Sequence, residues 1–185
     1  GNTIVGYDAG SDSNHSQATA LGYQAGKAVT ATGAVNIGYQ SGLAITSGAG
    51  NTSVGYLALT ALTTGTGNTA IGNKALEDAA TDGLDIAHNN TCVGSQSGMN
   101  ITYGTGNVTV GETCGAVYTH ADSNIIIGAN ANGSGATVGY EMAFGYGLTA
   151  AGTETCRIGR ASDYITNDFG ENAPWTHSSD IRIKK

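Results

Sequence analysis

The sequence predicts an all-β protein, a parallel β-solenoid or β-roll with about ten rungs of ~17 residues. Three observations predict this fold: one phrase returns at a regular interval, side chains alternate around a glycine in each copy, and large side chains are scarce. The 185 residues include 30 glycines but only two Phe and one Trp. A chain of this composition has to bury backbone and small side chains in a regular lattice.

The repeated phrase is easiest to follow from its glycine. The opening residues GNTIVGYDAG return at residues 50–59 as GNTSVGYLAL. Ten copies of this glycine can be aligned: Gly6, Gly22, Gly38, Gly55, Gly72, Gly94, Gly111, Gly128, Gly145 and Gly159. Their spacings are 16 or 17 residues, except for 22 before Gly94 and 14 before Gly159. Such a period is typical of a solenoid, in which each unit buries its face against the next.

A short segment before each glycine alternates with period two, which predicts a strand. The residue directly before the glycine is large and apolar in all ten copies, from Val5 to Ile158. The residue two positions earlier is Thr, Val, Ile, Met or Cys, so this pair shares one face, which we expect to point inward. The third residue after the glycine is small in nine copies, and predicts a second short strand lining a narrow interior.

Turn chemistry links the copies. Segments such as SGAGN, GTGTGN and YGTGN are rich in glycine, and an asparagine begins many of the expected strands. A rung this thin buries little apolar area alone. We therefore expect the large apolar row to pack against other copies of the chain, in an intertwined or side-by-side homotrimer around a three-fold axis.

Charge and residue spacing argue against several functions. The formal net charge is −7, and five of the seven Lys and Arg residues lie at 157–185. Nucleic acid is not an expected partner, because phosphate binding needs a clustered basic surface. Apolar runs are too short for membrane insertion. The three cysteines and four histidines have no ligand spacing, so we expect buried free thiols and neither a metal nor a cofactor.

The rungs NTAIGNKAL and NTSVGYLAL resemble those of trimeric autotransporter adhesin heads, and more closely the repeat regions of long phage and bacterial fibre proteins. The resemblance covers about residues 1–162. It implies parallel β-rolls associated as trimers. It also implies a virion tail-fibre location, with the bacterial cell surface as the alternative. The chain begins inside the repeated phrase without an initiator Met, which predicts a piece of a longer polypeptide.

The last residues, WTHSSDIRIKK at 175–185, are similar to the start of the endosialidase-type intramolecular chaperone domain of phage tailspikes, whose motif reads S-D-x-R-[LI]-K. The resemblance implies a chaperone that drives trimerisation and is released by cleavage between Ser179 and Asp180. Ser179 would be the nucleophile and Lys184 the candidate base. No other enzymatic activity is expected. The implied organisation is a repeat shaft at 1–162, a neck or linker at 163–179 and the beginning of the chaperone domain at 180–185.

Candidate binding residues follow the repeat glycine in five copies: Tyr7, Tyr23, Tyr39, Tyr56 and Tyr146. Polar residues come next in several copies, and we interpret the two sets as a ladder along the rod that stacks on sugar rings. The alternative is a structural stack that shields the rung edges. The extra residues at 77–90 form either a solvated loop or a loop that contacts a receptor.

The predicted function is structural and adhesive. The chain would be a segment of a homotrimeric phage tail fibre or tailspike that contacts a host cell-surface glycan or protein, with strength from many repeated contacts. A trimeric bacterial surface adhesin or extracellular fibre is the alternative. A polysaccharide depolymerase is a third hypothesis, and it would require acidic pairs along a groove.

Overall fold

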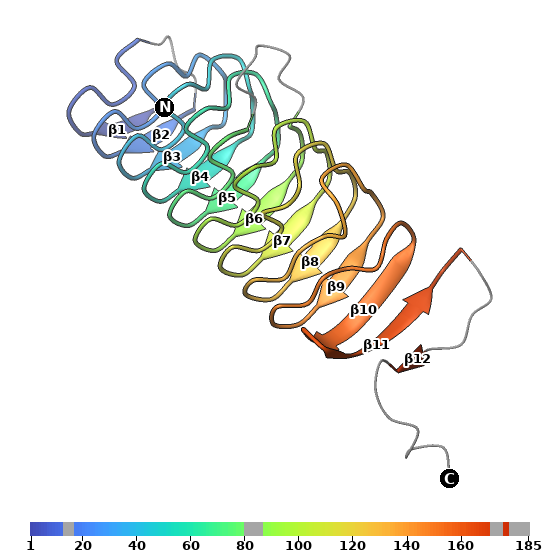
Figure 1. Ribbon diagram of the computed structural model, residues 1–185. Coiled ribbons are helices and arrows are strands. Elements are labelled where there is room, and N and C mark those ends of the chain that lie inside the picture. The colour runs from blue at the N-terminus through green and yellow to red at the C-terminus, as the bar shows by residue number, and fades with distance from the viewer. Residues whose placement is uncertain (13–16, 80–86, 171–175, 178–185) are drawn as a thin grey trace.

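The computed structural model describes residues 1–12, 17–79 and 87–170, and the backbone of 176–177. Within these ranges it is one sheet of twelve strands, each paired with the next strand in the chain. Figure 1 shows the strands as steps of a single rod. This confirms the predicted all-β solenoid. The strands are β1 (Thr3–Val5), β2 (Thr19–Leu21), β3 (Val35–Ile37), β4 (Thr52–Val54), β5 (Thr69–Ile71), β6 (Thr91–Val93), β7 (Val108–Val110), β8 (Ile125–Ile127), β9 (Met142–Phe144), β10 (Thr155–Arg160), β11 (Asp163–Asp168) and β12 (Thr176–His177).

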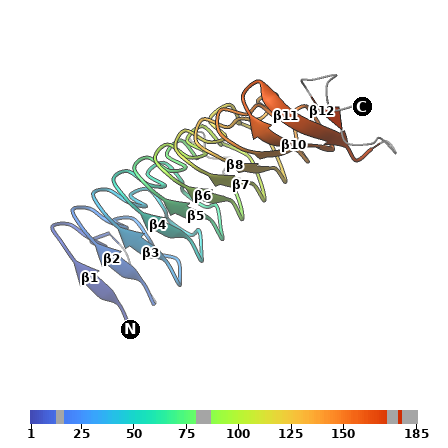
Figure 2. The same cartoon turned by 90° about the horizontal axis from the view of Figure 1, so that it is seen from below.

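Strands β1 to β10 are parallel and pair in one constant register. In β4 and β5, for example, Thr52 lies beside Thr69 and Val54 beside Ile71. Backbone bonds continue past the strand, since Gly72 N donates to the Val54 carbonyl over 2.8 Å. Seen from below in Figure 2, the flat strands line one side of the rod and the connecting turns curl over the other. Each rung is therefore held by the rung on either side of it.

The orientation of the strands differs from the expected one. From β2 to β9 the central residue is buried, and the residues flanking it are partly or fully exposed. In β5, Ala70 is fully buried while Ile71 is 40% exposed. The prediction that the apolar pair points inward was therefore wrong. Period two determines which residues share a face, but it does not say which face is the interior.

The segment after the glycine forms a turn, so the predicted second strand was also wrong. Ala25 N donates to the Gly22 carbonyl over 3.4 Å, and Gln24 has a φ of 53°, which a strand cannot accommodate. The small third residue does line the interior, as predicted: it is buried in the first nine rungs, from Ala9 to Leu148. Ser162, in the tenth, is exposed.

Larger side chains fill the rest of the core from a column that the sequence analysis missed. These residues lie seven positions after the repeat glycine and are fully buried: Val29, Ile45, Leu62, Ile101 and Tyr118. They belong to one continuous cluster with the buried alanines. A single chain thus builds a packed interior despite its small content of large residues.

The repeat glycine is required by the close approach of the next rung. Gly22 has a φ of +134°, and a Cβ at this position would lie 2.6 Å from the Gly38 carbonyl oxygen. Neither that φ nor that contact suits an L side chain. Since the same approach recurs at every step of the parallel array, the glycine recurs with it.

A buried asparagine ladder satisfies the polar backbone at the corners before β4 to β8. Asn68 donates its backbone N–H and its side-chain amide to Asn51 Oδ1, over 2.9 and 3.1 Å. Its amide also donates to the Ala87 carbonyl over 2.8 Å. The pattern continues to Asn124, where Glu141 takes the next position and donates its N–H to Asn124 Oδ1. Buried backbone groups are thereby paired along the rod.

The array ends in an antiparallel ribbon. Strand β11 runs back along β10, with Ile158 beside Ile165, and lies within the segment predicted as a neck. Arg157 takes the inward position of β10, in register with Ala143, and stacks over the Tyr164 ring at 4.4 Å. Its guanidinium donates to the Thr149 carbonyl over 2.8 Å. These contacts close the last rung of the core.

Candidate functional site

The outward side of β1 to β10 forms a long surface, here called the strand face. It consists of the first and third residues of each parallel triplet, two in each of ten strands, and none of these twenty residues is charged. Large apolar side chains stand exposed on it, with Val5 at 57%, Leu21 at 47% and Ile158 at 43%. Exposed apolar side chains repeated over such a length are typical of surfaces through which proteins associate.

A second surface, the tyrosine flank, lies at the corner that follows β1 to β4. It consists of Tyr7, Tyr23, Tyr39 and Tyr56, which the structure brings together in one stack. Neighbouring ring centroids are 5.4, 5.2 and 5.2 Å apart, and the planes differ by 8°, 9° and 15°. The ladder predicted from the sequence therefore exists for these four residues.

Tyr146 is separate from this stack. It follows its own repeat glycine and is 66% exposed, but it lies five rungs beyond Tyr56. The equivalent position in the intervening rungs is occupied by Asn73, Ser95, Glu112 and Ala129. Because aromatic stacking needs a ring on the adjacent rung, Tyr146 contributes nothing to the tyrosine flank.

Stacking determines which part of each ring can meet a ligand. Tyr23 and Tyr39 each have a ring on both sides, so their faces are covered while 42% of each residue stays exposed. A sugar ring cannot lie flat against either of them. The exposed parts are ring edges, and the flank presents a line of phenol groups along the rod.

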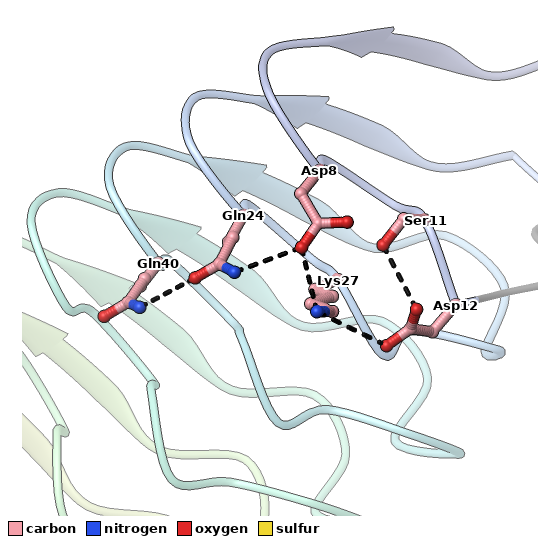
Figure 3. A network of polar contacts seen from close by, with 6 residues as sticks. All are labelled: Asp8, Ser11, Asp12, Gln24, Lys27 and Gln40. Atoms are coloured by element: carbon pink, nitrogen blue, oxygen red, sulfur yellow. Dashed lines mark hydrogen bonds and ion pairs between the residues drawn. The ribbon is translucent and has the colours of Figure 1, made fainter.

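A row of polar side chains, here called the amide row, runs beside the tyrosines (Figure 3). It consists of Asp8, Gln24 and Gln40. Gln24 Nε2 donates to Asp8 Oδ2 over 3.1 Å, and Gln40 Nε2 donates to Gln24 Oε1 over 2.8 Å. Leu57 occupies the next position, where the row ends. All three residues adopt a left-handed φ of 49–57°, so the backbone aims their side chains alike.

An ion pair fixes the first end of the amide row. Lys27 Nζ lies 2.8 Å from Asp8 Oδ2 and 3.9 Å from Asp12, to which Ser11 also donates. The hydrogen bond from Lys27 is the largest cause that lowers the pKa of Asp8 to about 2, followed by Ser11 and Gln24. The pKa of Lys27 is raised in turn, chiefly by Asp8. Both groups are therefore charged at neutral pH.

The sequence analysis missed the Lys27 contact. Lys27 lies 19 residues after Asp8, and the first rungs are 16 residues long. The pair can therefore be recognised only when equivalent positions on adjacent rungs are compared. On the rung of Lys27, the residue equivalent to Asp8 is Gln24, and Lys27 lies three positions after it. Figure 3 shows the Lys27 ammonium between the carboxylates of Asp8 and Asp12, both on the preceding rung.

The other candidate residues hold structural positions or fall outside the described chain. His88 Nδ1 accepts from Thr66 N over 3.0 Å, in a contact between rungs. The rest of the inserted loop at 80–86, with Asp82 and Asp85, lies outside the described residues, as do the predicted cleavage residues Ser179, Asp180 and Lys184.

The thiols are buried and free, as predicted. Burial raises the pKa of Cys92 to about 12 and that of Cys114 to about 11, so both stay protonated and unreactive at neutral pH. Within the described ranges, no group of three His, Cys, Asp or Glu side chains is placed to hold a metal ion. The same ranges contain no helix of the length and hydropathy that a membrane span requires.

One buried carboxylate deserves comparison with an active site, and its surroundings make it structural. Glu141 is fully buried and accepts from Tyr118 Oη over 3.0 Å and from the backbone N and hydroxyl of Ser134. Burial is the largest cause that raises the pKa of Tyr118, and the nearby Glu141 adds to it. The Glu141 and Tyr118 side chains are fully buried and already bonded to each other, so this cluster is an internal link between rungs.

The fold therefore defines a class, the parallel β-solenoid repeat proteins, with two surfaces available for association. Compared with known proteins, the chain matches no family model, no curated protein and no solved structure. The strand face and the tyrosine flank are the surfaces of the described chain that bear on its function.

Proposed function

We propose that the chain is a structural and receptor-binding segment of a homotrimeric fibre, a phage tail fibre or tailspike. The observation that carries this proposal is the strand face, which is uncharged along all ten parallel strands and carries a partly or fully exposed apolar side chain in each. Each exposed Å² of such a surface costs about 25 cal/mol relative to burial, so ten rungs together provide a strong drive for association.

Copies of the same chain are the partner that best fits this surface. The strand face repeats its side chains at the interval of the rungs, and another copy offers the same repeat with no charge to desolvate. Homo-oligomers with closed symmetry are also the commonest assemblies of soluble chains. The resemblance of the rungs to trimeric fibre proteins supports three copies.

The strand face changes in composition along the rod. In β1, β2 and β4 to β6 the first residue of the triplet is Thr, beside an apolar third residue. From β7 to β9 both positions are apolar, from Val108 and Val110 to Met142 and Phe144. The three chains would therefore bury the most apolar area per rung at these last rungs.

Receptor contact and chaperone processing form the remaining part of the proposal. Residues 175–185 resemble the start of the self-cleaving chaperone domain, which supports cleavage between Ser179 and Asp180 after trimerisation, with Lys184 as the base. A virion location follows from the same resemblance. Immunogold labelling of virions against bacterial surfaces distinguishes it from the surface-adhesin alternative.

The oligomeric state tests the fibre proposal. Light scattering of the full chain should give the mass of three copies. We expect Ile127→Glu, on the strand face, to dissociate the trimer, because it places three carboxylates against an apolar surface. Val117→Glu is the matched control, since Val117 is 38% exposed and Ile127 37%, but Val117 lies on a turn away from the strand face.

Two results would contradict the proposal. One is a wild-type chain that stays monomeric at all concentrations. The other is equal behaviour of the two Glu variants. Cleavage is tested separately by mass spectrometry of the full-length gene product, where Ser179→Ala should abolish the processed species, and an unprocessed wild-type protein would rule out self-cleavage.

A further inference from the structure

We propose that the tyrosine flank and the amide row bind an extended, neutral polysaccharide chain that lies parallel to the rod axis. This inference rests on the proposed receptor-binding function and names the class of ligand. The observation behind it is that two chemically different polar rows run side by side over the first three rungs, with one member of each row in every rung.

The first row is formed by the phenol groups. Because Tyr23 and Tyr39 are stacked between neighbours at 5.2–5.4 Å, their exposed groups repeat at that interval. A phenol hydroxyl both donates and accepts a hydrogen bond, as a sugar hydroxyl does. In an extended polysaccharide each sugar ring advances by a length close to this interval, so successive rings meet successive tyrosines.

The second row is formed by the side-chain amides. The first three tyrosines of the flank are each followed directly by a member of the amide row, as in Tyr23–Gln24 and Tyr39–Gln40. The bond from Gln40 to Gln24 uses one of two N–H groups on the donor and one of two lone pairs on the acceptor. The second N–H and the second lone pair can then bond a ligand, and the rung-to-rung bonds already hold the amides in place. Such preorganisation lowers the entropic cost of binding.

The charges favour a neutral polymer over an anionic one. Asp8 and Asp12 both face one cation, Lys27. The two rows together with Asp12 and Lys27 therefore carry a formal charge of −1, and the ammonium group of Lys27 is already paired. Recognition of sulfate, phosphate or uronate groups would need Lys or Arg with donors to spare. An anionic polysaccharide would be repelled at this surface.

The shape of the surface favours a polysaccharide over a protein ligand. Protein interfaces concentrate their affinity in a few aromatic or Arg side chains that enter pockets. Here the four rings form one linear stack and present edges, so each contact is weak and is repeated. Repetition strengthens binding only when the ligand is repetitive too, as a polysaccharide is.

The test compares wild-type chain, a double variant and a control on immobilised polysaccharides: linear glucans, mannans and galactans as neutral probes, and hyaluronan as the anionic probe. Tyr23→Phe with Tyr39→Phe removes two hydroxyls and keeps the ring stack, which near-UV circular dichroism verifies. We expect wild-type binding to at least one neutral probe, with affinity that rises with oligosaccharide length up to four units or more. The double variant should bind about thirtyfold more weakly, since each of the two lost hydrogen bonds contributes roughly 1 kcal/mol.

Tyr146→Phe is the matched control, because Tyr146 follows the same glycine and is exposed but lies outside the stack. It should bind like wild type. The inference is overturned if no neutral probe binds, if hyaluronan binds best, if affinity does not depend on length, or if the double variant binds as tightly as the control.

Adsorption to host cells separates this inference from the proposed function. A trimeric chain that adsorbs through a protease-sensitive receptor, with no effect of the double variant, would overturn the polysaccharide inference and leave the receptor-binding fibre intact. A chain that is monomeric and does not adsorb to cells would overturn both.

Discussion

Asn68 binds Asn51 twice, since its backbone N–H and its side-chain amide both donate to one carbonyl oxygen in a fully buried corner. The two residues are 17 positions apart, and the same pair of hydrogen bonds recurs between successive asparagines up to Asn124. No water reaches these groups, so each asparagine is the sole means by which the next rung satisfies its corner N–H.

Asn90→Ala should lower the free energy of unfolding by about 3 kcal/mol. The change removes the acceptor of Asn107 N–H, 3.0 Å away, and the donor to the Gly104 carbonyl at 2.6 Å, and leaves both groups buried. Denaturant titration followed by circular dichroism measures the loss. Asn73→Ala is the control and should stay within about 0.5 kcal/mol of wild type, because Asn73 is exposed. Equal effects of the two variants would show that the ladder adds nothing.

The core should show coupling between the central strand residue and the fourth residue after the repeat glycine. At Gly98 a Cβ would lie 2.5 Å from Cys92 Sγ. In the β5 rung the equivalent pair is Ala70 and Leu76, and Leu76 is fully buried with a φ of 51°. Gly98→Leu alone should therefore destabilise the chain by about 3 kcal/mol, because it overpacks the rung.

Adding Cys92→Ala should recover at least about 1 kcal/mol of that loss, since it recreates the smaller strand residue of the β5 rung. A double-mutant cycle on unfolding free energies gives this coupling. Additive effects of the two changes would contradict a direct steric relation between the positions.

The Asp8–Lys27 pair should make the amide row sensitive to strong acid only. Asp8 has its pKa lowered to about 2 from 3.8, so its contribution is present above 3.8 and is lost as the pH falls through about 2. An NMR titration of the Asp8 carboxyl carbon should find its midpoint there. In Lys27→Met the midpoint should rise toward the ordinary value, since the largest cause of the shift is gone. Lys74→Met, which breaks only the pair with Glu77, should leave it unchanged.

The sequence predicted the period and the strands because both depend on one steric requirement that leaves a visible mark. Every rung places a carbonyl against the Cα of the rung before it, so only glycine fits, as at Gly22. The residue before that glycine then belongs to a strand. No other element of the fold depends so directly on a single residue type.

The side of each strand that faces the core was harder to predict from the sequence. Ala70 and Ile71 alternate in the same way whichever of them points inward, and hydrophobicity alone favours the larger residue. Packing decides the outcome, because the large side chains seven positions after the glycine already fill much of the interior and leave space for a small central strand residue such as Ala70. The column at Leu62 and Tyr118 could have been found from the sequence, since it lies at a constant distance from the glycine.

The sequence predicted which tyrosines form the candidate site, but it did not predict which part of each ring is exposed. Tyr7 to Tyr56 occupy successive rungs, so stacking followed from the period. Edge-on exposure did not, because it depends on how far each ring is covered by its neighbours. Tyr146 shares the motif but has no neighbour of its kind, which a comparison of adjacent rungs would have revealed.

The pairing of β5 with β6 keeps the register of β4 with β5, although 22 residues instead of 17 separate Thr69 from Thr91. The five added residues leave the stacking of these rungs unchanged. Gain or loss of one whole unit would change the reach of the rod by ~4.8 Å, whereas insertions between strands would alter only its outline. The length of the rod can thus evolve by unequal recombination of whole units, while the segments between strands evolve separately by small insertions.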